Sequence, residues 1–301
     1  SAAALFGCYD GVATGEGAGV ARGVLRGKRE AALRRLGDLG RVLVAVSGGV
    51  DSAVLLALAV EALGRDSVLA VTAVSASLSD RDAKDARKLA RALGVRHLEV
   101  ATGELEDPGY RANGADRCYR CRRTMFQRLK EIAAREGFSR IAYGAIADDL
   151  DEFRPGMDAA REAGVEAPLL DAGLTKDEVR ALARDAGLEI REKPAGACLS
   201  TRIPFGSEIT AERLRQVEAA ESGLARLGFG LVRVRHHGDV ARLELDGEGT
   251  LRIVDDAVRA LAAAAVREAG FRFVAVDLDG YRRGAASPSS VEGEAENPDK
   301  L

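Results

Sequence analysis

The chain has 301 residues, of which 47% are hydrophobic and 30% are charged, and its formal net charge is −3. This length has room for two domains, and the composition is typical of a globular protein rather than a disordered one. Scattered basic residues argue against non-specific nucleic-acid binding. No apolar run is long enough to cross a bilayer, no secretory signal is visible, and the four cysteines do not suggest a secreted disulfide framework. We therefore expect a cytoplasmic protein.

The N-terminal part of the chain leads toward a buried strand. Residues 1–19 are small and glycine-rich, so we expect a flexible segment in which Cys8 is an incidental thiol. A helix should follow over residues 20–39. The run at 41–46, RVLVAV, is short and rich in valine, which predicts a strand buried on both faces.

The six residues SGGVDS at 47–52 predict a phosphate-binding turn between this strand and a helix that begins at Val50. Gly48 and Gly49 let the backbone approach an anion, and the free N–H groups of the first helical turn favour negative charge. Ser47 and Ser52 can donate hydroxyl hydrogen bonds, while Asp51 can hold a Mg²⁺ that shields phosphates. The turn has neither the Gly-Lys-Ser/Thr of a Walker loop nor GxGxxG. The alternative is an ordinary tight turn between strand and helix.

The next elements alternate between strands and helices, which predicts a doubly wound parallel sheet. We expect strands over 67–75 and 97–100, with a helix over 79–93 between them. Ligands of such sheets lie beyond the carboxyl ends of the strands. The end of the second strand, at Ala73 and Ser75, is therefore the expected place for adenine and ribose.

Acidic and basic side chains continue along the same ligand edge. A helix over 117–136 should lead to a strand over 141–145, which contains Gly144 and is followed by Asp148. This aspartate can hold a metal or orient a nucleotide, although a solvated acidic loop is the alternative. Thr175 and Glu178 predict a capping box at the start of the helix that ends near residue 186.

The remainder of the chain predicts a second, smaller α/β domain. A loop over 193–206, KPAGACLSTRIPFG, forms the exit from the first domain, which we place at 20–206. The second domain should span 207–284 and the disordered tail 285–301. Within the second domain we expect helices over 210–227 and 250–269, strands over 231–235, 239–245 and 271–278, and a hairpin turn at 237–239.

Three cysteines suggest a metal or redox site. Cys118 and Cys121 are three residues apart on one helix, so both sulfurs can face one point. Such a pair suits a redox dithiol, half a zinc site or part of an iron–sulfur site. With Cys198, three thiolates would leave one iron of a [4Fe–4S] cluster open, whereas zinc would normally take a fourth ligand such as His236 or His237. Burial of the cysteines as small hydrophobic residues is the remaining alternative.

Arginines offer a separate anion-binding face. Arg233 and Arg235 alternate along one strand and therefore project from the same side. Arg202 follows Cys198 by four residues. The planar guanidinium group suits carboxylate and phosphate. A solvated strand face is the alternative.

Taken together, SGGVDS, CYRC, GAIADDLDEFRPG, KPAGACLSTRIPFG, RVRHHGDVARLEL and VDLDGYRRG resemble the LarE family over roughly residues 25–284. These are ATP-dependent sulfur transferases of the PP-loop ATP pyrophosphatase superfamily that help to build a nickel-pincer cofactor. The resemblance implies an adenine nucleotide alpha hydrolase-like fold. It also implies adenylation of the carboxylates of a pyridinium-3,5-dicarboxylate mononucleotide, with release of pyrophosphate, and their conversion to thiocarboxylates. Members with three cysteines are expected to hold a [4Fe–4S] cluster, and members form oligomers. Arg122 stands where members commonly have lysine.

The resemblance and the residues together give one set of assignments. ATP and Mg²⁺ are assigned to the PP-loop, with weaker candidates after the fourth strand; the cluster, or less favourably zinc, to the cysteines; and the substrate to the arginines. We expect Cys198, Asp51 and Arg202 to act in catalysis. The alternatives are a tRNA 2-thiolation enzyme of the PP-loop class and a non-catalytic nucleotide-binding protein. The predicted site residues are Ser47, Gly48, Gly49, Asp51, Ser52, Ala73, Ser75, Gly144 and Asp148 for the nucleotide, Cys118, Cys121 and Cys198 for the metal, and Arg202, Arg233 and Arg235 for the substrate.

Overall fold

The computed structural model describes residues 16–150, 155–193, 196 and 198–282. The chain divides into two compact units. The expected flexible N-terminus up to residue 15, with Cys8, and the expected tail from residue 285 lie outside the described residues. The predicted domain limits at residues 206 and 284 stay predictions. The first unit is made of Ser1–Ser75, Asp80–Gly103 and Cys118–Gly196, and the second of Ala76–Ser79, Glu104–Arg117 and Ala197–Leu301.

The first unit is built on a four-stranded parallel sheet, as the alternation of strands and helices predicts. Its strands lie in the order β3-β2-β1-β4. The fourth strand ends before the predicted residue 145, because the Ala145 N–H donates to the carbonyl of Tyr143 and the chain turns there. The strands are β1 (Val42–Ala45), β2 (Val68–Val74), β3 (Arg96–Ala101) and β4 (Arg140–Ala142).

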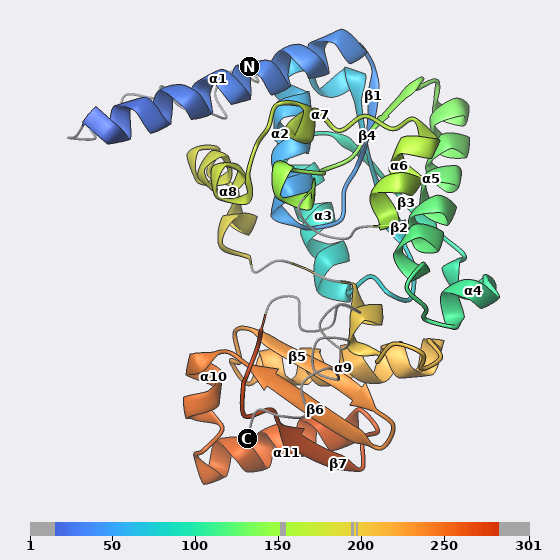
Figure 1. Ribbon diagram of the computed structural model, residues 1–301, viewed down its shortest axis with the longest axis vertical. Helices are drawn as coiled ribbons and strands as arrows, with labels where there is room; N and C mark the ends of the chain where they lie inside the picture. The colour runs from blue at the N-terminus through green and yellow to red at the C-terminus, as the bar shows by residue number, and fades with distance from the viewer. Residues whose placement is uncertain (1–15, 151–154, 194–195, 197, 283–301) are drawn as a thin grey trace, which may run out of the picture. The chain divides into compact units, whose positions relative to one another are not determined.

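Helices cover both faces of this sheet, which confirms the doubly wound fold (Figure 1). Side chains of a strand alternate between faces, so Val42 and Val44 pack on one side and Leu43 on the other. The Val42 face packs against α1 (Glu16–Leu39), α2 (Val50–Leu63), α3 (Asp80–Leu93) and α8 (Lys176–Asp185), and the Leu43 face against α5 (Arg117–Glu136) and α6 (Pro155–Ala163).

Short helices connect these elements. The capping box at Thr175 and Glu178 is present and starts α8, as predicted. The helix predicted over 20–39 begins earlier, at Glu16. The short pieces, which lack the long apolar period of a predictable helix, are η2 (Arg65–Ser67), η3 (Glu104–Glu106), α4 (Pro108–Arg111), η4 (Ala147–Leu150), α7 (Pro168–Asp171), η5 (Glu189–Glu192) and η6 (Leu199–Arg202).

The second unit contains a three-stranded mixed sheet. Its strands β5 (Val232–His237), β6 (Val240–Leu245) and β7 (Phe273–Val276) lie in this order, with β5 antiparallel and β7 parallel to β6. His237 pairs with Val240 across the predicted hairpin turn, where Gly238 has a φ of 63°. The helix α9 (Ala211–Arg226) packs against β5.

The helix predicted over 250–269 is wrong as a single element. The structure has α10 (Gly247–Arg252) and α11 (Asp256–Glu268) instead. The Asp255 carboxylate accepts hydrogen bonds from the N–H groups of Ala257 and Val258, both at 3.0 Å, so a new helix starts there. The last strand is also shorter than the predicted 271–278.

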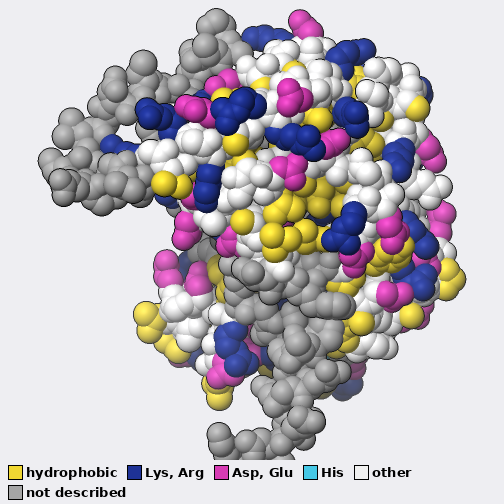
Figure 2. Space-filling view, turned by 45° about the horizontal axis from the view of Figure 1, so that its top comes forward, with side chains coloured by type: hydrophobic (Ala, Val, Ile, Leu, Met, Phe, Trp, Pro, Cys, Tyr) yellow, Lys and Arg dark blue, Asp and Glu magenta, His cyan; other side chains and the backbone are white. Residues whose placement is uncertain are grey.

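The surface carries charges of both signs. Over the face drawn in Figure 2, basic and acidic side chains are interspersed rather than gathered in a block of one sign. None of the helices within the described ranges is long and apolar enough to span a membrane.

Candidate functional site

The PP-loop, residues 47–52, is held in shape by its own two serines. The Ser47 N–H donates to Ser52 Oγ at 3.2 Å, and the two hydroxyl oxygens are also 3.2 Å apart. Ser52 Oγ in turn donates to the carbonyl of Gly49 at 3.0 Å. Gly49 has an extended backbone and precedes α2, and no side chain caps the first N–H groups of that helix. These N–H groups therefore remain directed at an anion.

At Gly48 the backbone of the PP-loop lies too close to the backbone of Asp82 to leave room for a Cβ atom. Its φ is 75°, and a Cβ atom placed there would lie 2.8 Å from the carbonyl carbon and 2.9 Å from the Cα of Asp82. Gly144 is similarly close to the loop, since its Cβ would lie 2.9 Å from the backbone nitrogen of Ser52. Gly144 thus lets the chain that follows β4 pack against the start of α2, a reason that its place in the predicted strand did not reveal.

Asp51 forms a close ion pair at the start of α2. Both of its carboxylate oxygens accept from Lys176 Nζ at 2.8 Å. The backbone N–H of Lys176 donates to Asp148 at 2.8 Å, so this predicted residue joins the same cluster. Burial raises the pKa of the Asp51 carboxyl above its ordinary value, and the Lys176 ammonium opposes that shift.

Lys193 is a second lysine at the loop, which the sequence alone did not single out. Its Nζ donates to the carbonyl of Gly48 at 2.9 Å and pairs with Asp82 at 2.6 Å and Asp85 at 2.5 Å. The side chain of Lys193 is 10% exposed. This contact fastens the end of the first unit's chain to the PP-loop.

Ala73 and Ser75 lie where the sequence predicts them. Ala73 is near the carboxyl end of β2 and Ser75 follows that strand, and both are half-buried. Because β2 pairs directly with β1, this end belongs to the same sheet edge as the PP-loop. Their contact with adenine and ribose stays a prediction.

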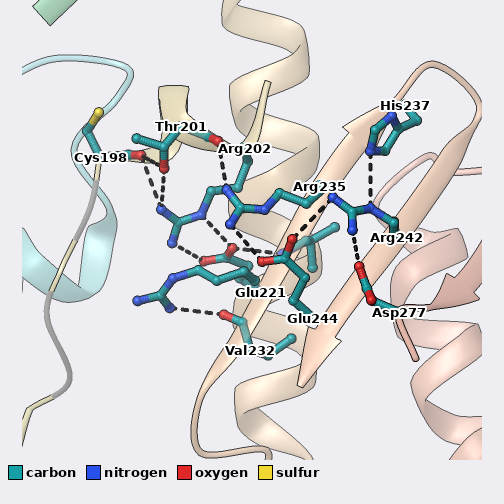
Figure 3. A network of polar contacts seen from close by, with 12 residues as sticks. Cys198, Thr201, Arg202, Glu221, Val232, Arg235, His237, Arg242, Glu244 and Asp277 are labelled. Carbon is teal, nitrogen blue, oxygen red and sulfur yellow. Dashed lines mark hydrogen bonds and ion pairs between the residues drawn. The ribbon is translucent and has the colours of Figure 1, made fainter. Parts of the chain in front are cut away.

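The second unit holds the predicted arginines in a network of ion pairs (Figure 3). Arg202 donates from Nε and Nη2 to the two carboxylate oxygens of Glu221, at 2.8 and 3.0 Å. Arg235 donates to Glu244 at 2.6 Å and to the carbonyl of Thr201 at 2.8 Å. Fork-shaped pairing fixes the plane of a guanidinium group as well as its position.

Arg233 lies in the same network but has a different environment. It donates to the carbonyl of Val232 at 3.0 Å and lies over the ring of Tyr281. Burial lowers the pKa of Arg233, and the nearby guanidinium of Arg202 lowers it further. A cation that is raised in energy in this way gains more from a bound anion than an exposed one does.

Glu221 and Glu244 are functional candidates that the sequence reasoning missed. Glu244 is 2% exposed and lies directly opposite Arg233 in the β5–β6 register. The predicted hairpin turn already fixes the register of the two strands. The sequence therefore could have predicted that Glu244 lies opposite the strand that carries Arg233 and Arg235. Glu221 lies on α9, where its helical spacing resembles that of any solvated glutamate.

The cysteines fall in both compact units. Cys118 and Cys121 lie on successive turns of α5, the first exposed and the second half-buried, and Cys198 is exposed in the second unit. None of these three cysteines forms a disulfide within the described residues. Within the described ranges, no three His, Cys, Asp or Glu side chains form a group that can hold a metal ion. His236 and His237 have partners of their own, Gln216 and Arg242.

Comparison with known proteins places this arrangement among ATP-using enzymes. The NAD synthase family model matches residues 32–109, which include the PP-loop. The uncharacterized protein slr1717 of Synechocystis is 40% identical over 261 residues, or 87% of this chain and 97% of that protein.

Other relatives have named activities. A tRNA-specific 2-thiouridylase of Mycolicibacterium smegmatis is 32% identical over 231 residues, covering 66% of this chain and 64% of that protein. The pyridinium-3,5-bisthiocarboxylic acid mononucleotide synthase of Lactiplantibacillus plantarum is 38% identical over 259 residues, covering 85% of this chain and 92% of that protein. This identity over nearly the whole length of both proteins shows that the chain belongs to the pyridinium-3,5-bisthiocarboxylic acid mononucleotide synthase family, the LarE family that its motifs indicate.

Proposed function

We propose that this protein is an ATP-dependent sulfur transferase that adenylates the carboxylates of a pyridinium-3,5-dicarboxylate mononucleotide and converts them to thiocarboxylates. The observation that carries the proposal is the glycine turn before α2, where no side chain caps the helix and the first backbone N–H groups are available to an anion. The family relationship supplies the substrate class.

The first half-reaction uses the PP-loop. Ser47, Gly48, Gly49 and Ser52 hold the phosphates of ATP, with Ala73 and Ser75 beside adenine and ribose. A substrate carboxylate oxygen attacks the α-phosphorus, the bond to the β-phosphate oxygen breaks, and pyrophosphate leaves. The product is a mixed anhydride of the carboxylate and AMP. Asp51 offers the hard oxygen ligands that Mg²⁺ prefers, so it would hold the metal that shields the phosphates, with Asp148 keeping Lys176 in place beside it.

The second half-reaction delivers sulfur. A sulfur nucleophile attacks the activated carbonyl carbon, AMP leaves, and the thiocarboxylate remains. AMP is needed because a carboxylate oxygen by itself is too poor a leaving group. The nucleophile is sulfide-level sulfur that is not bonded to protein carbon, so its attack and the departure of AMP leave the thiocarboxylate directly. We assign Cys198 to the group that supplies this sulfide and the binding of substrate phosphate or carboxylates to Arg202, Arg233 and Arg235, whose polar contacts preorganise them.

The cysteines are the candidate ligands of a [4Fe–4S] cluster. Cys118 and Cys121 suit this group, because they are not in a disulfide and lie one helical turn apart on α5, and Cys198 would be the third ligand. When bound, the cluster would supply an exchangeable sulfide at the iron without a cysteine ligand. Zinc is the alternative occupant. We further propose a cytoplasmic location, where thiols stay reduced, and a homo-oligomer.

Measurement of pyrophosphate tests the proposal most directly. Purified protein should release pyrophosphate from ATP only when the pyridinium dicarboxylate mononucleotide is present, and mass spectrometry should then detect the thiocarboxylate. Release that depends on tRNA instead would establish the second candidate, tRNA 2-thiolation, which the thiouridylase relative favours. ATP binding without release under either condition would establish a non-catalytic nucleotide-binding protein.

A further inference from the structure

A buried pair of side chains, Asn113 and Arg117, fastens the loop that carries Cys198. We call residues 198–207 the cysteine loop; they contain η6 and the predicted substrate ligand Arg202. The segment Glu104–Arg117 belongs to the same compact unit, although some ninety positions separate it from the loop in sequence. Neither Asn113 nor Arg117 carries a PP-loop or metal motif, and the mechanism above does not use them.

Asn113 bonds the backbone of the cysteine loop at several points. Its Nδ2 donates to the carbonyls of Ile203, Pro204 and Ser207, at 3.2, 2.7 and 3.1 Å. Its own carbonyl accepts from the N–H of Gly206 at 3.2 Å. The residue is fully buried, so these bonds are shielded from water.

The backbone of Asn113 has a conformation that is unusual for a residue with a side chain. Its φ is 56°, and among the described non-glycine residues it alone has a positive φ. Glycine adopts this conformation more easily than asparagine. Asparagine at this position therefore carries a conformational cost, which its contacts with the cysteine loop help to offset.

Arg117 makes a second set of contacts with the cysteine loop. Its Nη1 donates to Asn113 Oδ1 at 2.7 Å and to the carbonyl of Ser200 at 3.2 Å, and the guanidinium lies over the ring of Phe205. Arg117 is 5% exposed.

The contacts bear on the reacting groups through Ser200 and Cys198. Tyr110 also bonds to Ser200, with its hydroxyl 2.6 Å from Ser200 Oγ. Two positions earlier, the carbonyl of Cys198 accepts from Thr201 Oγ1 at 2.9 Å and from Arg202 Nη1 at 3.2 Å. The loop is thus tied at its far side by Asn113 and Arg117, while its exposed side presents the thiol.

We propose that Asn113 and Arg117 are positioning residues for sulfur transfer: they fix the cysteine loop so that Cys198 and Arg202 keep a constant geometry. The inference rests on the proposed function, because it gives the two residues their purpose through the sulfur step. Misplacement of a reacting group by about 1 Å can lower a rate 100-fold.

The test measures thiol reactivity and turnover separately in the full-length chain. Three variants are compared. Asn113→Asp is nearly isosteric but places a hydrogen-bond acceptor opposite three carbonyl groups, and Asn113→Gly keeps the backbone conformation without the side chain. Arg117→Gln removes the guanidinium group. Arg128→Gln is the matched control, since Arg128 lies on the same helix in an exposed pair with Glu131. Site-resolved alkylation followed by peptide mass spectrometry gives the labelling rates of Cys198 and Cys118, and calorimetry gives the affinity for ATP.

We expect the Cys198 labelling rate to change at least threefold in all three variants and kcat for thiocarboxylate formation to fall at least tenfold. ATP affinity should stay within twofold of the wild type, and the control should match the wild type throughout. Arg117→Lys, which keeps one cationic donor, should restore part of the loss and serves where the other variants fail to fold.

Two results would overturn the inference: unchanged labelling rates in folded variants, or a loss of ATP affinity by the same factor as kcat, which indicates general damage. A wild-type protein that forms no thiocarboxylate would instead overturn the proposed function, whatever the labelling rates show.

Discussion

The two adjacent glycines of the PP-loop allow a sharp test of how the nucleotide site is built. Gly48→Ala places a methyl group against the backbone of Asp82, with the carbonyl carbon 2.8 Å away, and forces alanine into a φ of 75°. Gly49→Ala places the same group 3.4 Å from Ser47 Oγ, an ordinary contact, at a φ of −95°. The substitutions are chemically identical and one residue apart.

The structure sets different magnitudes for the two variants. Left-handed backbone costs alanine about 1–2 kcal/mol, and overpacking against a backbone that cannot rotate away costs about 1–3 kcal/mol more. Gly48→Ala should therefore lower the free energy of unfolding by about 2–5 kcal/mol. Gly49→Ala should change it by less than about 1 kcal/mol, and it can stabilise the protein by restricting the unfolded chain.

Denaturant unfolding followed by circular dichroism measures both values, and calorimetry measures ATP affinity. Gly48→Ala should also lose most of its ATP affinity, because the loop must move away from Asp82 to accept the methyl group. Unfolding of the two variants at the same denaturant concentration would contradict the expected difference in stability. Wild-type ATP affinity in Gly48→Ala would contradict the expected effect on the nucleotide site.

Three further predictions concern charges. Lys193→Met should lower the free energy of unfolding by about 2–3 kcal/mol and weaken ATP binding, since Asp82 and Asp85 lose their cation and Gly48 loses its donor; unchanged unfolding and affinity would contradict this. Glu244→Gln should cost about 3–5 kcal/mol because it leaves Arg235 buried with a neutral partner, whereas Arg128→Gln should cost less than about 1 kcal/mol, and equal losses in denaturant titrations would refute the comparison. Burial lowers the pKa of His97, His236 and His237 below the ordinary value of 6.5, so just below that pH the unfolded chain binds more protons than the folded chain does. The free energy of unfolding should therefore fall on acidification from about pH 7.5 to 5.5. His97→Gln should flatten this dependence in urea titrations, and an unchanged slope would exclude a contribution from His97.

Local sequence patterns predicted the elements of the first unit well. The valine run before Ser47 and the helical period after Val50 each specify one element, and the structure has both. The capping box at Thr175 was equally readable, because its two side chains are three positions apart. Each of these features depends only on contacts within one turn or one strand.

What the sequence left hidden depends on contacts between distant positions. Nothing near Lys193 indicates that its ammonium reaches the carbonyl of Gly48, 145 positions earlier. Asn113 looks like an ordinary loop residue until its three carbonyl partners are seen. The split of the predicted 250–269 helix is a different kind of miss, because Asp255 was a readable cap that a continuous apolar period concealed.

The charge balance of the arginine network supports the proposal that it binds an anionic substrate. Arg202, Arg233, Arg235 and Arg242 are accompanied by three carboxylates, Glu221, Glu244 and Asp277, so the network keeps an excess of one positive charge. Without these carboxylates, four neighbouring cations would repel one another and the chain would separate them. If the carboxylates equalled the arginines in number, the network would be neutral and a bound anion would gain little electrostatic energy from it. A single excess cation among fixed ion pairs attracts a carboxylate or phosphate and requires little rearrangement when it binds, which is the condition that electrostatic preorganisation sets.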